Sequence, residues 1–177
     1  MSTNHDTVTP PSIFSTLSER IKHTLIRKDR VIWLSGNRGE GLCIPKSPKV
    51  IKALKTYGLI GIYYASGNPI FSQRSLIYLP NVALTLNRYK NFAECNRLCA
   101  EEWNKICFEG HNNWTPSSVK HWVKINQYTW HECIDMHSCE LVPRIIHSYF
   151  NHMGGIAELK RATKYKNTNC PKQMVCS

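Results

Sequence analysis

The sequence has 177 residues, which suits one domain that buries a real core. Apolar residues make up 42% of the chain and aromatic residues 10%, which argues against a disordered, fibrous or membrane protein. The 23 Lys and Arg exceed the 12 Asp and Glu, and the resulting net charge of +11 fits either a solubilising surface or a surface that binds nucleic acid.

The N-terminal region shows no export or membrane signal. Residues 1–20 are polar and lack the basic and apolar regions of a Sec-type signal peptide. No apolar run approaches the length of a membrane span, and no strongly basic amphipathic helix indicates binding to an anionic membrane. We therefore expect a soluble chain without membrane insertion, and any export has to use a route that reads no Sec signal.

Eight cysteines would indicate disulfides in a small secreted chain, but here no secretory context and no Cys-x-x-Cys pair accompanies them. We expect reduced thiols that pack mostly as small hydrophobic side chains. A bridge or a metal site formed by Cys170 and Cys176 is an alternative at the end of the chain.

The first part of the chain alternates short helices and short strands. Residues 1–15 have two adjacent prolines and no hydrophobic period, which is typical of a mobile leader. Apolar spacing and turn residues then predict a helix over 17–27, a strand over 31–34, a helix over 48–58, a strand over 59–64, a β-rich run over 75–86, and helices over 91–105 and 116–124. Thr115 suits the N-cap of the last helix.

Residues 128–155 hold half of the eight histidines. Two strands are expected there, over 128–132 and 139–142, with a polar turn at 135–138 between them. A helix is expected to follow directly. The product is a ββα unit, which can aim one residue from the first strand and two from the helix at a single point.

The helix of this unit sets a geometric condition. Pro143 suits its first turn, since the missing N–H costs nothing there, and Gly154-Gly155 is a natural C-terminal breaker. His147 and His152 are five positions apart, or about 140° around an ideal helix. They therefore do not share one face, and His152 has to lie where the helix, expected to run to about that residue, already unwinds.

Several short motifs occur in a fixed order here. They are Trp130-His131, Leu141-Val142-Pro143, Ile146-His147 and His152-Met153-Gly154-Gly155. Together they resemble the HNH and endonuclease VII superfamily of histidine–metal finger nucleases, in particular the Trp-His-His branch common as toxin domains of bacterial polymorphic toxins. Residues 61–72 and 88–96 resemble the segments of that family around its Pro-Asp-Phe-Ser motif and its "R..DF..AN" helix start, so the resemblance covers roughly 33–160.

The resemblance implies an α+β fold. Its C-terminal part would be a ββα-metal motif joined to a small mixed α/β N-terminal portion. We expect a flexible leader over 1–30, a nuclease domain over 31–165 with its ββα core at 128–155, and a tail over 166–177.

The chain departs from the family pattern at four positions. Glu132 replaces the second histidine of the Trp-His-His motif, and Glu140 stands where glutamine is usual. Ile70 replaces an aspartate and Met153 a common threonine, and both of these changes concern packing. The exchange at Glu132 bears directly on which residue is the general base.

The resemblance implies hydrolysis of phosphodiester bonds with one divalent ion. Mg²⁺ is the first expectation, with Zn²⁺, Mn²⁺ and Ni²⁺ as alternatives. By position, the metal ligands would be His131, His147 and His152. Glu132 would be the base or a further ligand, and an exchange of roles between His131 and Glu132 stays open because a carboxylate near a cation is a weaker base.

Other residues are expected to support this site. Glu140 is a candidate for orienting a ligand histidine or a water, and Arg144 and Lys160 are candidates for phosphate contacts. Trp130 is expected to be core. The histidines outside the motif, His111 and His121, are expected to play a polar structural role.

The leading functional hypothesis is a DNA-cleaving toxin that is exported by a dedicated secretion system, acts in the cytoplasm of a target cell and is neutralised by an acidic immunity protein. An RNA-cleaving toxin and a phage or mobile-element nuclease are alternatives on the same scaffold. A different class is a non-catalytic zinc-binding nucleic-acid module, in which Cys133, Cys139 and two histidines form a closed structural site.

Overall fold

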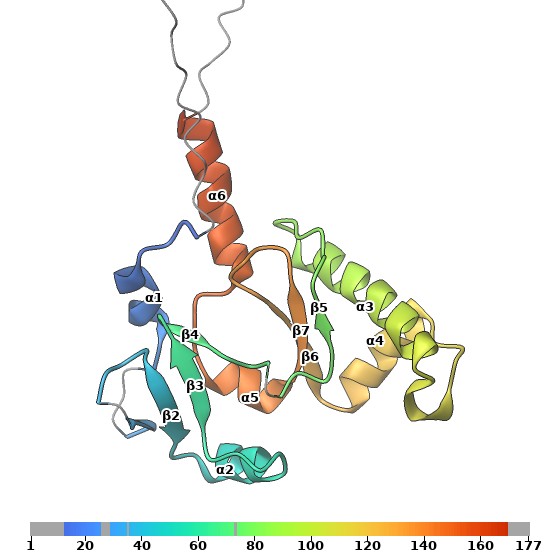
Figure 1. Cartoon of the computed structure of the whole chain (residues 1–177), viewed down its shortest axis with the longest axis horizontal. Coiled ribbons are helices and arrows are strands. Elements are labelled where there is room, and N and C mark those ends of the chain that lie inside the picture. The colour runs from blue at the N-terminus through green and yellow to red at the C-terminus, as the bar shows by residue number, and fades with distance from the viewer. Residues whose placement is uncertain (1–12, 26–28, 35, 73, 170–177) are drawn as a thin grey trace, which may run out of the picture.

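The computed structural model describes residues 13–25, 29–34, 36–72 and 74–169. These residues form two small antiparallel sheets and six α-helices, which confirms the predicted α+β class (Figure 1). Residues 1–12 of the predicted leader and the pair Cys170 and Cys176 lie outside the described residues.

The first sheet belongs to the N-terminal part of the chain. Its strands are β1 (Val31–Trp33), β2 (Gly41–Pro45), β3 (Ile62–Ala65) and β4 (Asn68–Pro69), in that spatial order. Helix α2 (Pro48–Lys55) connects β2 to β3 and buries Val50 and Leu54 in the core cluster of this sheet. Helix α1 (Leu17–His23) precedes the sheet, and Thr16 and Glu19 form a capping box at its start.

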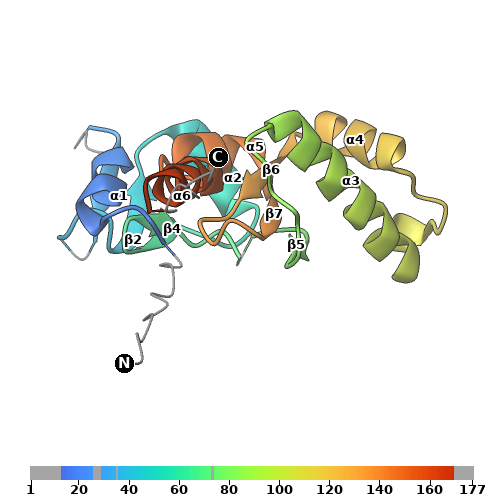
Figure 2. The same ribbon diagram turned by 90° about the horizontal axis from the view of Figure 1, so that it is seen from above.

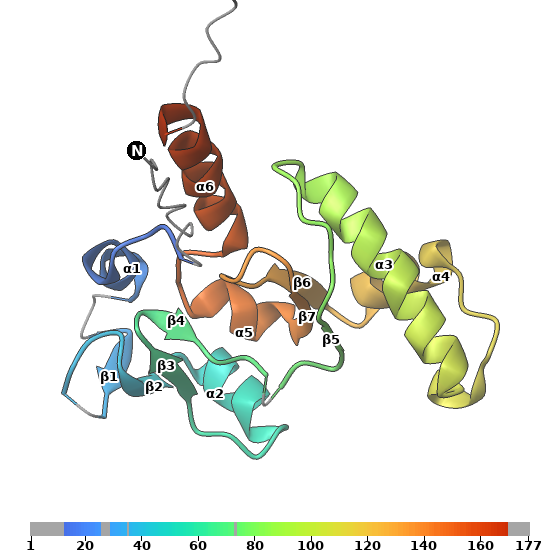
Figure 3. The same ribbon diagram turned by 45° about the horizontal axis from the view of Figure 1, so that its top comes forward.

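The second sheet carries the ββα unit. Its strands are β5 (Tyr78–Leu79), β7 (Cys139–Pro143) and β6 (Tyr128–Glu132), in that spatial order. Helices α3 (Arg88–Lys105) and α4 (Pro116–Ile125) lie side by side on one face, with the short 3-10 turn Phe108–Gly110 between them (Figure 2). Helix α5 (Arg144–Tyr149) follows β7 directly and lies between the two sheets (Figure 3).

Alternate residues of the hairpin formed by β6 and β7 face two different cores. Trp130 and Leu141 pack with residues of α3 and α4, whereas Val142 packs with the first sheet. Successive side chains of a strand point to opposite faces. His131 therefore lies on the face toward the first sheet and α5, and Glu132 lies on the face toward α3.

The predicted order of helices and strands is largely confirmed, with several differences. Strands β2 and β4 were not predicted, and only Tyr78–Leu79 of the β-rich run 75–86 is a strand. Helix α1 ends at His23 rather than at 27. The prediction that the helix after Pro143 runs to about His152 was wrong, because α5 ends at Tyr149 and a further helix, α6 (Gly155–Asn169), begins at the glycine that was expected to be a breaker.

Helix α6 holds the N-terminal segment through a buried carboxylate. Glu158 is fully buried, and its Oε2 accepts hydrogen bonds from the backbone N–H groups of Phe14 and Ser15 at 2.9 and 3.0 Å. Arg161 donates to Glu19 at 3.0 Å. Leu25, farther along the same segment, belongs to the core of the first sheet. These contacts fix residues 14–25, which fall within the segment predicted as a leader, against the folded body.

Among the described residues, no helix is both long enough and apolar enough to cross a membrane.

Replacing Glu158 with alanine tests the anchoring of the N-terminal segment. The change leaves one buried and one partly buried N–H donor without an acceptor, and each costs about 1–3 kcal/mol, so we expect Glu158→Ala to lower the free energy of unfolding by about 2–6 kcal/mol. Urea unfolding followed by circular dichroism measures it. The exposed Glu102, paired with Lys105 on α3, is the matched control, and Glu102→Ala should cost less than about 1 kcal/mol. Equal losses in the two variants would contradict the assignment.

Candidate functional site

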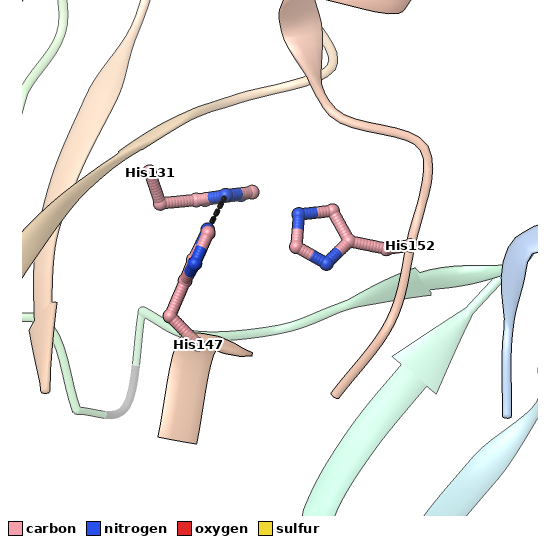
Figure 4. Close-up of side chains that lie close together, drawn as sticks. All are labelled: His131, His147 and His152. Atoms are coloured by element: carbon pink, nitrogen blue, oxygen red, sulfur yellow. Dashed lines mark hydrogen bonds between the residues drawn. The ribbon is translucent and has the colours of Figure 1, made fainter. Parts of the chain in front are cut away.

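Three histidines converge between the second sheet, α5 and the segment that joins α5 to α6. His131 comes from β6, His147 from α5, and His152 from the joining segment (Figure 4). One ring nitrogen of each lies within 4.8 Å of the others, and His131 Nδ1 is 3.3 Å from His147 Nε2. The ring centroids are 4.8 to 5.3 Å apart. The cluster thus has the composition of a three-nitrogen metal site.

The early end of α5 brings His152 to its partners. The helix stops at Tyr149, and Phe150 caps it in a non-helical conformation. His152 therefore lies outside the helix, and the angle of about 140° that would separate it from His147 on an ideal helix does not apply. His152 Nδ1 donates to the carbonyl oxygen of Phe150 at 2.9 Å. This hydrogen bond fixes the tautomer and leaves Nε2 as the nitrogen with a free lone pair.

The ring of Phe71 packs against all three histidine rings. It is 1% exposed, and its ring centroid lies 5.0 Å from that of His131 and 5.6 Å from those of His147 and His152. Phe71 follows β4, so a residue of the first sheet's core holds side chains of β6, α5 and the segment after α5 in place. Figure 1 shows how the chain passes from β4 toward β5 at this point.

Burial keeps the three imidazoles neutral. Desolvation lowers the pKa of His131 well below its usual range, and it also lowers the pKa of His152. The same cause, with the neighbouring His152 and Arg88 charges, lowers the pKa of His147 to about 3. Neutral imidazole is the form that binds a metal ion, so the donor set fits a divalent cation.

A pocket of about 340 Å³ opens onto the histidines. Arg88 and Glu132 line it together with His23, Ser148 and Asn151. Glu132 is the only carboxylate among the described residues that line this pocket, and its side chain is 2% exposed. The pocket therefore combines ligand nitrogens, a cation and one carboxylate, which is a set suited to binding and hydrolysing a phosphate ester.

Both oxygens of Glu132 are engaged by α3. Oε2 accepts from Arg88 Nε at 3.0 Å, and Oε1 accepts from Asn91 Nδ2 at 3.0 Å. Glu132 is absent from the three-histidine ligand group. The geometry thus favours a role beside the metal over a role as a further ligand.

Glu140 lies behind His131, with which it pairs across the two strands. Its carboxylate, a ring nitrogen of His131 and the thiol of Cys133 lie within 4.8 Å of one another. Burial and the charge of Asp135 raise the pKa of Glu140 to about 7. This position is consistent with a supporting role toward His131.

The remaining residues singled out from the sequence lie elsewhere. Arg144 and Lys160 are exposed, and neither lines the pocket of the three histidines. Cys139 is fully buried on the α3 face of the hairpin and belongs to neither candidate metal group among the described residues, so the structure does not form the closed zinc site considered above.

Sequence reasoning assigned no role to Arg88, Asn91, Phe71 or His23. Arg88 and Asn91 stood inside the recognised helix-start motif, and Phe71 inside the segment resembling the Pro-Asp-Phe-Ser motif. Their motifs were the available signal. His23 offered none, because its place in the pocket depends on the packing of α1 against distant segments.

Gly155 gives a direct test of how the site is assembled. A Cβ at this residue would clash with the backbone carbonyl of Cys133, whereas a Cβ at Gly154 would meet only ordinary contacts, the nearest 3.6 Å away. We expect Gly155→Ala to destabilise the fold by about 1–3 kcal/mol and to weaken metal binding about tenfold or more, because His152 moves with the chain. Thermal unfolding and Zn²⁺ titration calorimetry measure the two effects. Gly154→Ala is the matched control, and identical behaviour of the two variants would refute the close-approach explanation.

Comparison with known proteins agrees with the geometry. The family model for the DNase/tRNase domain of colicin-like bacteriocins matches residues 61–154, which include the three histidines, Arg88 and Glu132. No curated protein and no solved structure matches the chain. The match covers more than half of the chain and confirms the resemblance to a bacterial nuclease toxin domain. The chain therefore belongs to the family of DNase/tRNase domains of colicin-like bacteriocins.

Proposed function

We propose that this chain is a metal-dependent endonuclease that hydrolyses phosphodiester bonds of DNA. The observation that carries the proposal is the convergence of three neutral histidine rings in one pocket with Arg88 and Glu132. The chain belongs to a family of DNase and tRNase domains, and this membership supports cleavage of phosphodiester bonds as the reaction.

His131, His147 and His152 are the proposed ligands of one divalent ion. A divalent ion bound there would stabilise the negative charge that develops on the phosphate and on the leaving oxygen. Three imidazole nitrogens suit Zn²⁺, Ni²⁺ or Mn²⁺ better than Mg²⁺, which prefers oxygen ligands. Mg²⁺, the first expectation from the sequence, therefore becomes one arm of the test.

Arg88 and Glu132 are proposed to act on the substrate from the opposite wall of the pocket. The planar guanidinium of Arg88 suits a two-point contact with phosphate oxygens. Glu132 holds it in place, and Asn91 in turn donates a hydrogen bond to Glu132. Glu132 is the proposed general base that accepts the proton of the attacking water. Arg144 and Lys160 are proposed phosphate contacts farther along the nucleic acid, and Glu140 is proposed to orient His131.

The biological role is proposed from the family. We propose an antibacterial toxin that a dedicated secretion system delivers into a target cell and that an immunity protein neutralises. The net charge of +11 makes an acidic immunity protein the complementary partner.

RNA is the second candidate substrate. The family description includes tRNases beside DNases, and the three-histidine site acts on the phosphate that both nucleic acids share. Cleavage of RNA by the same site is therefore the alternative to be measured in parallel.

The direct test is cleavage of plasmid DNA and of total RNA by the purified chain. We expect nicking with at least one of Zn²⁺, Ni²⁺, Mn²⁺ and Mg²⁺ and none with EDTA. His131→Ala and His147→Ala should each lower the rate by at least about a hundredfold, since losing even an outer-shell partner of a metal ligand costs about 10- to 100-fold.

His121→Ala is the matched control for these substitutions. His121 is exposed on α4 and does not line the pocket, so the variant should cut at the wild-type rate. A folded wild-type chain that cuts neither nucleic acid with any metal would sink the proposal.

The role of Glu132 can be separated from that of Arg88 by a double-mutant cycle. We expect Glu132→Gln to lower kcat about 10²- to 10⁴-fold, as for loss of a general base, and Arg88→Ala mainly to raise KM. If Glu132 only positions Arg88, the double variant will be no slower than Arg88→Ala alone. Rates on plasmid DNA at saturating metal decide between the two roles, and the second result would contradict the assignment as base.

A further inference from the structure

A second pocket of about 400 Å³ lies next to the histidine pocket, between α3, α4 and β6. Its walls are the aromatic residues Tyr89, Phe92, Tyr128 and Trp130. It lies on the α3 face of β6, opposite the face that carries His131.

The two pockets adjoin along three elements. Trp130 lines both of them. On α3, Arg88 lines the first pocket and the next residue, Tyr89, lines the second. On α5, Ser148 lines the first and Arg144, one turn earlier, lines the second. The shared and neighbouring lining residues therefore place the aromatic pocket beside the histidine pocket.

The rim of the second pocket is positively charged. Lys120 and Lys124 from α4 and Arg144 from α5 line it, and no carboxylate does so among the described residues. All three cations are exposed. This surface is complementary to a chain of phosphates.

One aromatic wall of the pocket is fully open to a ligand. Tyr89 is 90% exposed, so its ring gains nothing from burial in the fold, whereas Phe92 and Tyr128 are partly buried and Trp130 is only 3% exposed. Trp130 is held by a hydrogen bond of 2.9 Å from its Nε1 to Asn96 Oδ1, and Tyr128 by one of 3.0 Å to the hydroxyl of Tyr57. Fixed rings beside a free one form a stacking platform of the kind that binds nucleobases.

We propose that this pocket binds an unpaired nucleotide of the substrate strand, next to the phosphate that is cleaved. The aromatic walls would stack on the base, and Lys120, Lys124 and Arg144 would contact its phosphates. A base inside an intact duplex enters only after it is unstacked and unpaired, which costs free energy, so the pocket makes the enzyme prefer DNA or RNA with unpaired nucleotides beside the cut. The proposal rests on the proposed nuclease function and names the substrate feature that the enzyme selects.

Binding without cleavage tests the pocket itself. Single-stranded DNA and RNA oligonucleotides that contain 2-aminopurine are titrated with the full chain in EDTA, and the fluorescence of the base reports stacking. We expect Tyr89→Ala to weaken binding about tenfold and to remove the stacking signal. Lys120→Ala with Lys124→Ala should lower the slope of log Kd against log salt by about 1.4, or about 0.7 for each phosphate contact on a single strand.

Lys49→Ala with Lys52→Ala is the matched control, since both lysines are exposed on α2 and line neither pocket. This pair should leave the slope and the stacking signal at the wild-type values. Equal effects of the two lysine pairs, or a stacking signal that Tyr89→Ala does not change, would overturn the proposal. A polyglutamate peptide whose binding depends on Lys120 and Lys124, while oligonucleotide binding does not, would assign the pocket to an acidic polypeptide and also overturn it.

Cleavage completes the test. Duplexes with the same sequence, either fully paired or with a short single-stranded gap, are cut side by side. We expect the wild type to prefer the gapped duplex and Tyr89→Ala to lower that preference about tenfold. If the wild type cuts DNA or RNA but Tyr89→Ala keeps the preference for the gapped duplex, the proposed role of the pocket is wrong, whereas the proposed nuclease function is supported. If the wild type cuts nothing with any metal, the nuclease fails, and the binding experiment alone decides whether the pocket takes a base.

Discussion

The packing of Phe71 against three histidine rings joins the two halves of the molecule. Phe71 belongs to the core of the first sheet, and the rings that it contacts come from β6, α5 and the segment before α6. Burial by this ring removes water from the imidazoles, and that desolvation holds their pKa values low and their lone pairs available for a metal ion. The first sheet is therefore part of the site rather than a separate support, although it contributes none of the ligand side chains.

The spacing of the ligands depends on where helices end. A longer α5 would carry His152 away from His147, so the stop at Tyr149 is a condition for the cluster. The following chain is then pressed against the hairpin, where Gly155 sits on the carbonyl of Cys133 and starts α6. Glu158 and Arg161, about one and two turns further along α6, fix the N-terminal segment that brings His23 to the pocket. One short stretch of chain thus sets both the position of His152 and a wall of the pocket.

Local pattern predicted the ββα unit, because strand alternation, proline and glycine all lie within 128–155, and the resemblance to the nuclease superfamily singled out its three histidines. Local pattern failed where pairing with distant residues decides the structure. Strand β2 exists through its pairing with β1 and β3, and the short β5 through its pairing with β7. Gly154 and Gly155 were expected to end a helix, as local propensity indicates, but Gly155 packs closely on Cys133 and begins α6. The ties from Glu132 to Arg88 and Asn91 span more than 40 residues, so no local rule reveals them.

Strand β6 separates two sets of side chains. His131 points to His147 and His152 on one face, while Trp130 and Glu132 point to α3 on the other. The carboxylate of Glu132 suits this second face, because one of its oxygens accepts a hydrogen bond from Arg88 and the other accepts one from Asn91. A neutral imidazole has a single acceptor nitrogen and could not accept both hydrogen bonds. Arg88 then stands at the junction of the histidine pocket and the aromatic pocket that begins at Tyr89. Changes on α3 and α4 therefore alter the walls of the aromatic pocket without replacing any of the three histidines.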